Sequence, residues 1–140
     1  MVAGIQHPFA QAFADAWSKP TPEKLVALLH PDVVLFQPHL PPIRGRDNAF
    51  KEFQRLFAWI PGFHGVVERS SGDDKLLFIE WQMKVPAGKD TVSLRAVDRF
   101  RLENGVGVER AVYFDQLVLI IAVLTHPGLW RGYIKYRFGW

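Results

Sequence analysis

Asp98 is the first candidate for chemistry in this sequence, because it interrupts an apolar pattern. Residues 94–102 alternate between apolar and polar side chains, as a β-strand does when one face is buried and the other meets water. The first of these faces carries Leu94, Ala96, Asp98, Phe100 and Leu102. A carboxylate on such a face needs hydrogen-bond partners or holds its proton more tightly. Asp98 is therefore a candidate acid or base, and the alternative is a structural residue bonded to a neighbouring group.

The residues after this strand predict which side chains accompany Asp98. The pair Asn104-Gly105 is the strongest short signal for a β-hairpin. A regular hairpin around this turn places Asp98 opposite Ala111, whose small side chain leaves room for a ligand. It also brings Tyr113 and Asp115 to the same face. An odd-length loop would turn the side chains of the second strand to the other face, so this prediction depends on the turn.

Three more ionisable residues are candidates, each with a simpler alternative. His39 follows a short predicted strand in a proline-rich segment, and its imidazole titrates near neutrality, although a loop histidine is more often solvated. Asp115 either acts on a ligand or caps the helix that begins at Gln116. Glu80 lies within a predicted strand and either faces solvent or supplies a second acid.

Helices are predicted before these residues. Residues 8–18 form a helix with its aromatic side chains spaced by four on one face. A second helix follows the N-cap Thr21 and includes Leu29, before His30-Pro31 stops it. A third helix follows Asp47, its predicted N-cap, and ends before a Pro-Gly pair.

The strands complete the predicted architecture. A meander of antiparallel strands after the helices indicates an α+β fold, a cone-shaped barrel whose strongly curved antiparallel sheet wraps on the N-terminal helices, with a C-terminal helix added. The face that carries Asp98 would line the cavity of the cone. We expect one domain over residues 1–140. The predicted strands cover residues 32–37, 63–69, 75–85, 94–102 and 106–115.

The composition excludes several classes of protein. The chain has no cysteine, which excludes disulfides and Cys-ligated metals and fits the cytoplasm, where we expect this protein. Its net charge of +3, without a basic run, predicts no nucleic acid partner. No feature calls for a metal or another cofactor, and the N-terminal residues lack the pattern of a signal peptide.

The C-terminal part, residues 116–140, combines an apolar segment with a tail that interleaves aromatic and basic residues. Two interpretations stay open. The favoured one is that the helix plugs the cone or packs in a homodimer. The other is peripheral contact of the tail with an anionic membrane surface, where rings and basic side chains are favoured.

The chain resembles the SnoaL-like branch of the nuclear-transport-factor-2-like superfamily, whose relatives include ketosteroid isomerases, polyketide cyclases and limonene epoxide hydrolases. The resemblance implies the cone fold. It rests on the order and spacing of residues 13–17 (FADAW), 25–32 (LVALLHPD), 43–47 (IRGRD), 97–101 (VDRFR) and 108–115 (VERAVYFD).

The resemblance also implies roles for single residues. Asp98 falls where ketosteroid isomerases keep a protonated acid that donates a hydrogen bond to an oxyanion. Phe13 and Gln37 stand where those enzymes have a tyrosine and a general base, and neither side chain can replace these groups. Asp115 matches one acid of the epoxide hydrolases, with Glu80 as a substitute for the other. The single-acid chemistry of the cyclases would use Asp98 with His39.

We therefore expect an enzyme that binds a small lipophilic molecule and performs acid/base chemistry of the isomerase or cyclase type. The alternatives are a non-catalytic ligand-binding or dimerisation module and an epoxide hydrolase. The expected catalytic residues are Asp98, His39 and Asp115. The expected substrate-binding residues are Phe13, Trp17, Gln37, Trp59, Glu80, Phe100 and Tyr113.

Overall fold

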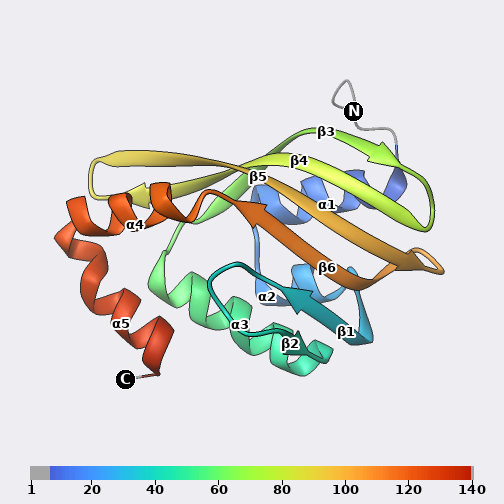
Figure 1. Ribbon diagram of the computed structural model, residues 1–140, viewed down its shortest axis with the longest axis horizontal. Helices are drawn as coiled ribbons and strands as arrows, with labels where there is room; N and C mark the ends of the chain where they lie inside the picture. The colour runs from blue at the N-terminus through green and yellow to red at the C-terminus, as the bar shows by residue number, and fades with distance from the viewer. Residues whose placement is uncertain (1–6, 140) are drawn as a thin grey trace.

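The computed structural model describes residues 7–139 and shows a curved sheet that covers three N-terminal helices (Figure 1). Two further helices, α4 and α5, lie at one end of the sheet. The helices are α1 (Pro8–Ser18), α2 (Pro22–Val26), α3 (Arg46–Trp59), α4 (Gln116–Thr125), the short 3-10 helix η1 (Pro127–Leu129) and α5 (Trp130–Phe138). The strands are β1 (Leu29–Phe36), β2 (Ile43–Arg44), β3 (His64–Gly72), β4 (Leu76–Ala87), β5 (Asp90–Glu103) and β6 (Val106–Phe114).

The predicted α+β cone is confirmed, with one change in the sheet. The strand order is β2-β1-β6-β5-β4-β3, and most neighbours are antiparallel. β1 runs parallel to β6 instead of belonging to an antiparallel meander. A parallel neighbour needs a long connection, and the chain from α3 to β5 supplies it.

Aromatic side chains of α1 attach this helix to the inner face of the sheet. The predicted apolar face is buried, with Phe13 at 1% and Trp17 at 3% exposure. Both rings pack on Trp81 of β4, with centroids 5.2 and 4.8 Å apart. The core therefore lies between α1, α3 and the concave side of the sheet.

Two predicted boundaries in the first part of the chain are wrong. The second helix ends at Val26, because Leu29 already pairs with Gly107 as the first residue of β1. The third helix is preceded by Gly45, whose φ of 87° suits glycine, and not by Asp47 as N-cap. Asp47 lies in the first helical turn, where the helix dipole favours a carboxylate.

The predicted hairpin turn is confirmed, but the predicted register is wrong. Asn104 and Gly105 have φ of 52° and 79°, and Glu103 pairs with Val106. The register then shifts, because Leu102 pairs with Gly107 while Arg101 pairs with Glu109. Val108 is left as a β-bulge.

The bulge exchanges the two faces of β6. Asp98 lies opposite Val112 and not opposite Ala111. Arg110 is buried at 4% exposure, whereas Tyr113 is 53% exposed on the outer side of the sheet. One extra residue thus brings a cation, and not the predicted tyrosine, to the face of Asp98.

The C-terminal helices pack at one end of the sheet, against α3 (Figure 1). The ring of Tyr136 on α5 stacks on Trp59 of α3 with centroids 4.9 Å apart. α5 comes this close because Gly132 faces the same tryptophan, where a Cβ atom would lie 2.8 Å from Cδ1 of Trp59. Within residues 7–139, no single helix is long and apolar enough to cross a membrane. α4 and the segment 127–138 pass that test only as a pair, and the axes of the two parts are bent by 104° relative to each other.

Candidate functional site

A small cavity of about 50 Å³ lies inside the cone at the end where α4 and α5 pack (Figure 1). Its walls come from α1, α3, the loop after β1, the inner face of the sheet and both C-terminal helices. Most of the lining is aromatic or aliphatic, and charge interactions are stronger in such surroundings than in bulk water. The lining residues that carry polar groups or large rings include Trp17, Gln37, His39, Trp59, Arg110 and Tyr136.

Arg110 is the charged side chain of this cavity. Its Nε donates a hydrogen bond to Oδ2 of Asp98 at 2.5 Å. Its guanidinium carbon lies 5.5 Å from the ring centre of Trp17 and 5.9 Å from those of Phe13 and Phe100. A cation placed above the face of an aromatic ring is attracted to it. A guanidinium is always charged and carries five N–H donors, so Arg110 can bind an anionic or carbonyl oxygen in the cavity.

Asp98 holds Arg110 in place from behind the cavity wall. The carboxyl group is fully buried, and its second oxygen accepts a hydrogen bond from Nε1 of Trp81 at 2.8 Å. Burial raises the pKa of Asp98, while the guanidinium of Arg110 and the indole N–H of Trp81 oppose that rise. Both partners are donors only, so Asp98 serves them as an acceptor.

His39 and Tyr136 form a second polar pair at the cavity. Nε2 of His39 lies 2.9 Å from the hydroxyl oxygen of Tyr136. Burial, aided by the charge of Arg137, lowers the pKa of His39 to about 4, so the imidazole is neutral at pH 7. Its Nδ1 is buried and has no hydrogen-bond partner among residues 7–139. A buried imidazole nitrogen without a partner is available to a ligand.

Glu52 extends this pair into α3. The side chain is 1% exposed, and Nη2 of Arg55 lies 3.7 Å from Oε2. Burial raises the pKa of Glu52, while the Tyr136 hydroxyl and the Arg55 charge lower it. Burial and the neighbouring Glu52 in turn raise the pKa of the Tyr136 phenol. His39, Glu52 and Tyr136, from three distant segments, therefore lie together beside the cavity.

An apolar groove of about 420 Å³ continues from this point to the surface between α4 and α5. His39, Trp59 and Leu119 belong to the walls of both the cavity and the groove. The rest of the groove is lined mainly by aliphatic and aromatic side chains of the two helices. A ligand in the groove would therefore reach His39 before it reaches Arg110.

Comparison with known families identifies this fold. The model of the SnoaL-like domain matches residues 10–110, which is most of the chain. This chain belongs to the SnoaL-like domain family. The match ends at Arg110, so α4 and α5 lie outside it. A comparison with curated proteins finds no match.

Solved structures of low sequence identity share the fold of this chain. A candidate SnoaL-like polyketide cyclase from Jannaschia sp. CCS1 is 17% identical, with a TM-score of 0.71 over 84% of this chain and 95% of that one. A protein with a ketosteroid isomerase-like fold from Catenulispora acidiphila DSM 44928, in complex with trimethylamine, is 17% identical, with a TM-score of 0.72 over 86% and 92%. An LEH-like epoxide hydrolase from M. tuberculosis is 21% identical, with a TM-score of 0.67 over 91% and 90%.

The structure of this SnoaL-like protein gathers part of the set predicted from its sequence. Trp17, Gln37, His39 and Trp59 line the cavity. Phe13 and Phe100 lie in the core against Arg110, one layer behind the cavity. Asp98 lies in the same layer, bonded to Arg110.

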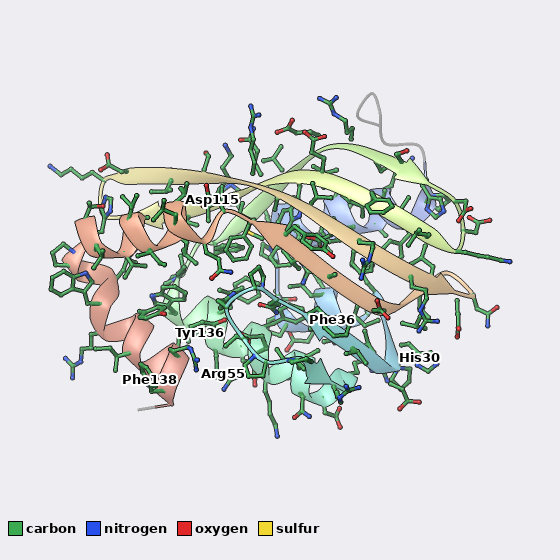
Figure 2. All side chains as sticks on the ribbon, viewed as in Figure 1. His30, Phe36, Arg55, Asp115, Tyr136 and Phe138 are labelled. Carbon is green, nitrogen blue, oxygen red and sulfur yellow. The ribbon has the colours of Figure 1, made fainter. Side chains whose placement is uncertain are left out.

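Three predicted residues lie elsewhere. Glu80 is on the outer face of the sheet, where its Oε2 lies 3.3 Å from Nε of Arg69. Tyr113 is exposed on the same face. Asp115 caps α4, and its Oδ1 accepts a hydrogen bond from the N–H of Leu117 at 2.9 Å; Figure 2 labels it at the start of that helix, with Tyr136 on α5. The structure therefore does not bring Glu80 and Asp115 together in the cavity.

Arg110, Tyr136 and Glu52 were not predicted from the sequence. In a hairpin without a bulge, Arg110 would point outward. The bulge at Val108 turns its side chain to the inner face, so the regular pattern of the sequence does not indicate it. A buried acid in the amphipathic pattern of α3 is the one local signal that could have indicated Glu52. Tyr136 carries no local signal, since its partner His39 is 97 residues away.

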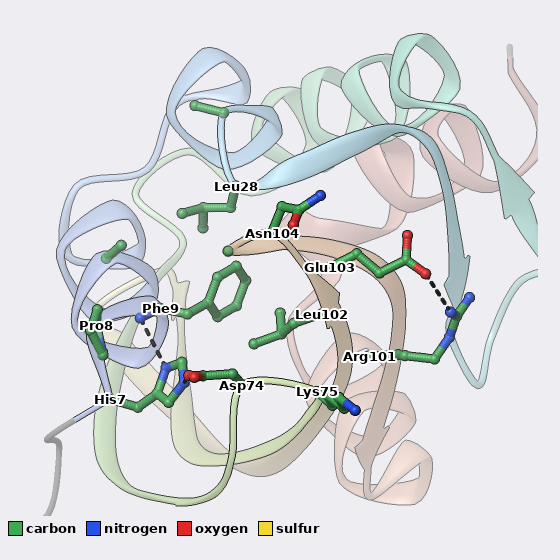
Figure 3. A pocket seen from close by; sticks show the side chains of 13 residues that line it. His7, Pro8, Phe9, Leu28, Asp74, Lys75, Arg101, Leu102, Glu103 and Asn104 are labelled. Carbon is green, nitrogen blue, oxygen red and sulfur yellow. Dashed lines mark hydrogen bonds and ion pairs between the residues drawn. The ribbon is translucent and has the colours of Figure 1, made fainter.

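A larger hollow of about 910 Å³ at the opposite end of the molecule is a weaker candidate (Figure 3). Four of the polar side chains that line it already pair with one another, His7 with Asp74 at 2.8 Å and Arg101 with Glu103 at 3.3 Å. Within the described part of the chain, the buried side-chain atoms without a hydrogen-bond partner belong to His39 and Glu52, at the other end. Residues 7–139 also contain no group of three metal-ligating side chains.

Proposed function

We propose that this SnoaL-like protein binds a small lipophilic molecule with a carbonyl or acidic oxygen in the cone and catalyses proton transfer on it, as an isomerase or cyclase of the enolate type. The observation that carries the proposal is the buried guanidinium of Arg110, fixed by Asp98 at the wall of an aromatic cavity. Burial of such a cation costs free energy, and a hydrogen bond to a ligand oxygen would offset part of that cost.

Arg110 is the proposed oxygen-binding group. When a proton leaves the carbon beside a carbonyl, negative charge develops on the oxygen, and donors fixed in advance stabilise that charge. The hydrogen bond to Asp98 fixes Nε, which leaves the other N–H groups of the guanidinium for the ligand. Asp98 is then a positioning residue that acts through Arg110.

His39 is the proposed proton carrier. When Nε2–H donates to the Tyr136 hydroxyl, Nδ1 presents a free lone pair, and this nitrogen is the buried one without a partner. The low pKa keeps the imidazole unprotonated before the reaction. An oxyanion that forms in the same cavity attracts the proton and raises the pKa of His39 as the reaction proceeds.

Ligand entry requires movement of α4 and α5. The cavity holds about 50 Å³, whereas ligand sites usually span about 300–1,000 Å³. The adjoining groove of about 420 Å³ indicates where the space can open, since Leu119 of α4 and Tyr136 of α5 form part of the cavity wall. The single domain, the homodimer and the cytoplasmic location stay predictions made from the sequence.

Exchange of hydrogen for deuterium on a model ketone tests the reaction. β-Tetralone in deuterium oxide exchanges the hydrogens beside its carbonyl, and the rate is followed by proton NMR. We expect the wild type to accelerate exchange, and His39→Gln to lose about a hundredfold or more of that acceleration. His64→Gln is the matched control, because His64 bonds the Gly62 carbonyl on the surface.

The second candidate is a non-catalytic binding protein. It is favoured by the low pKa of His39 and by the engagement of both Asp98 oxygens. Saturable binding of the ketone without accelerated exchange would establish this candidate. Acceleration that His39→Gln leaves unchanged would remove the histidine from the mechanism.

A further inference from the structure

The outward side of α4 is unusually apolar for a surface helix. Only Ala122 of this helix is buried. The exposed side chains recur at positions i, i+3, i+4 and i+7, so they form one continuous stripe. These side chains are Leu117 at 63%, Ile120 at 51%, Ile121 at 51% and Leu124 at 63% exposure.

α5 continues this surface and adds positive charge. Its inner side packs on α3 through Gly132 and Tyr136. Its outer side presents a ridge with a spacing of four residues, formed by Trp130, Ile134 and Phe138, and all three are exposed. By helical geometry, Arg131 and Lys135 lie on one side of that ridge and Arg137 lies on the other.

We define the α4–α5 face as these exposed side chains of the two helices, which lie together at one end of the sheet (Figures 1 and 2). Residues 116–139 include no Asp or Glu, so the basic side chains of the face have no acidic neighbour in the same segment. An apolar ridge flanked by basic residues is the pattern of helices that lie in the interface of an anionic membrane.

We propose that the α4–α5 face docks on an anionic lipid surface. The apolar ridge would enter the boundary between headgroups and acyl chains, and Arg131, Lys135 and Arg137 would contact the phosphates. The helices would lie on the membrane and not cross it, because they are bent by 104° and their inner sides pack on the cone.

A second copy of the chain fits this face less well. A symmetric dimer would place the α4–α5 face of one copy on that of the other. The basic residues would then approach one another without an acid between residues 116 and 139 to neutralise them. Like charges brought together at an interface are unfavourable, whereas lipid phosphates neutralise them.

Docking would also explain where the groove opens. Ile120, Leu124, Trp130 and Ile134 belong both to the α4–α5 face and to the walls of the groove. A lipophilic ligand dissolved in the membrane would enter the groove without crossing water. This consequence rests on the proposed function, but the docking surface itself does not.

Flotation with lipid vesicles tests the docking surface. The full chain is mixed with vesicles of phosphatidylcholine alone or with phosphatidylglycerol added. We expect strong binding to the anionic vesicles, weakened by salt. The triple change Arg131→Gln, Lys135→Gln, Arg137→Gln should reduce the affinity about a hundredfold, roughly fivefold per charge. The single change Leu124→Asp should also weaken binding.

Matched controls keep the test specific. Lys51→Gln removes an exposed charge from α3, and Leu76→Asp changes an exposed apolar residue of β4. Both should bind like the wild type, and circular dichroism shows whether each variant is folded. Equal binding by the triple variant, or no binding to anionic vesicles, would overturn the proposal. A dimer in sedimentation that Leu124→Asp abolishes, without vesicle binding, would show that a second copy covers the face.

Discussion

The two faces of the β5–β6 ladder carry the same kinds of ion pair in different surroundings. On the inner face, the side chains of Arg110 and Asp98 are 5% and 0% exposed, and Asp98 has one further partner, the indole N–H of Trp81. On the outer face, Arg99 and Glu109 are 37% and 31% exposed, with Nη2 and Oε1 3.3 Å apart. Glu109 also contacts Arg101, so the outer charges form a network. Because these side chains are exposed, water molecules can replace each of the contacts between them.

This comparison shows what burial does to identical chemistry. An exposed pair is screened, so its geometry is adjustable and its contribution to stability is small. A buried pair is held in one arrangement, because each charge without its partner would be left in an apolar surrounding. Arg110 can therefore serve as a fixed group for a ligand, whereas Arg99 cannot.

The two faces should differ most in how much stability is lost when one partner of an ion pair is removed. Asp98→Leu leaves the Arg110 cation buried and unpaired, and we expect a loss of about 3–5 kcal/mol in the free energy of unfolding. Glu109→Leu removes an exposed partner and should cost less than about 1 kcal/mol. Urea denaturation followed by tryptophan fluorescence measures both. Losses of similar size would show that the inner pair is no more constrained than the outer one.

A smaller effect should appear in the pH dependence of stability. The unfolded chain protonates His39 near pH 6.5, but the folded chain does so only near pH 4, because burial lowers the pKa. Protonation of His39 therefore leaves the free energy of unfolding unchanged above pH 6.5 and lowers it as the pH decreases from 6.5 to 4. This part of the loss should amount to roughly 2 kcal/mol.

His39→Gln should remove that part of the pH dependence, and His64→Gln, which leaves His39 unchanged, should keep it. Urea denaturation at several values between pH 7.5 and 4.5 provides the comparison. A slope that is the same in wild type and His39→Gln would mean that His39 titrates like a solvated histidine, contrary to its buried position at the cavity.

Local signals explain why much of the fold could be predicted. The helix α1 was predicted with its observed bounds from the spacing of its aromatic residues. Asn104-Gly105 predicted the turn, and Asp115 predicted the start of α4. Each of these features depends on residues a few positions apart, which a sequence displays directly.

The candidate site depends on contacts that no local pattern encodes. The bulge at Val108 lies where β6 pairs with both β1 and β5, and it turns Arg110 inward. The pair of His39 and Tyr136 exists because α5 packs on α3. The sequence therefore indicated the buried acid of β5 but not the cation that it holds.

The measurement that tests the central claim most directly is the binding of β-naphthol, whose naphtholate form imitates an enolate. Its fluorescence reports the ionisation of the bound molecule. The double variant Asp98→Leu, Arg110→Met removes both inner charges and leaves neither unpaired, and Glu109→Leu, Arg99→Met is its counterpart on the outer face. We predict that the wild type and the outer variant bind naphtholate in preference to neutral naphthol. The inner variant should lose roughly tenfold to a hundredfold in affinity for naphtholate. Equal preference for naphtholate in both folded double variants would contradict the claim that Arg110 is the oxygen-binding group of this protein.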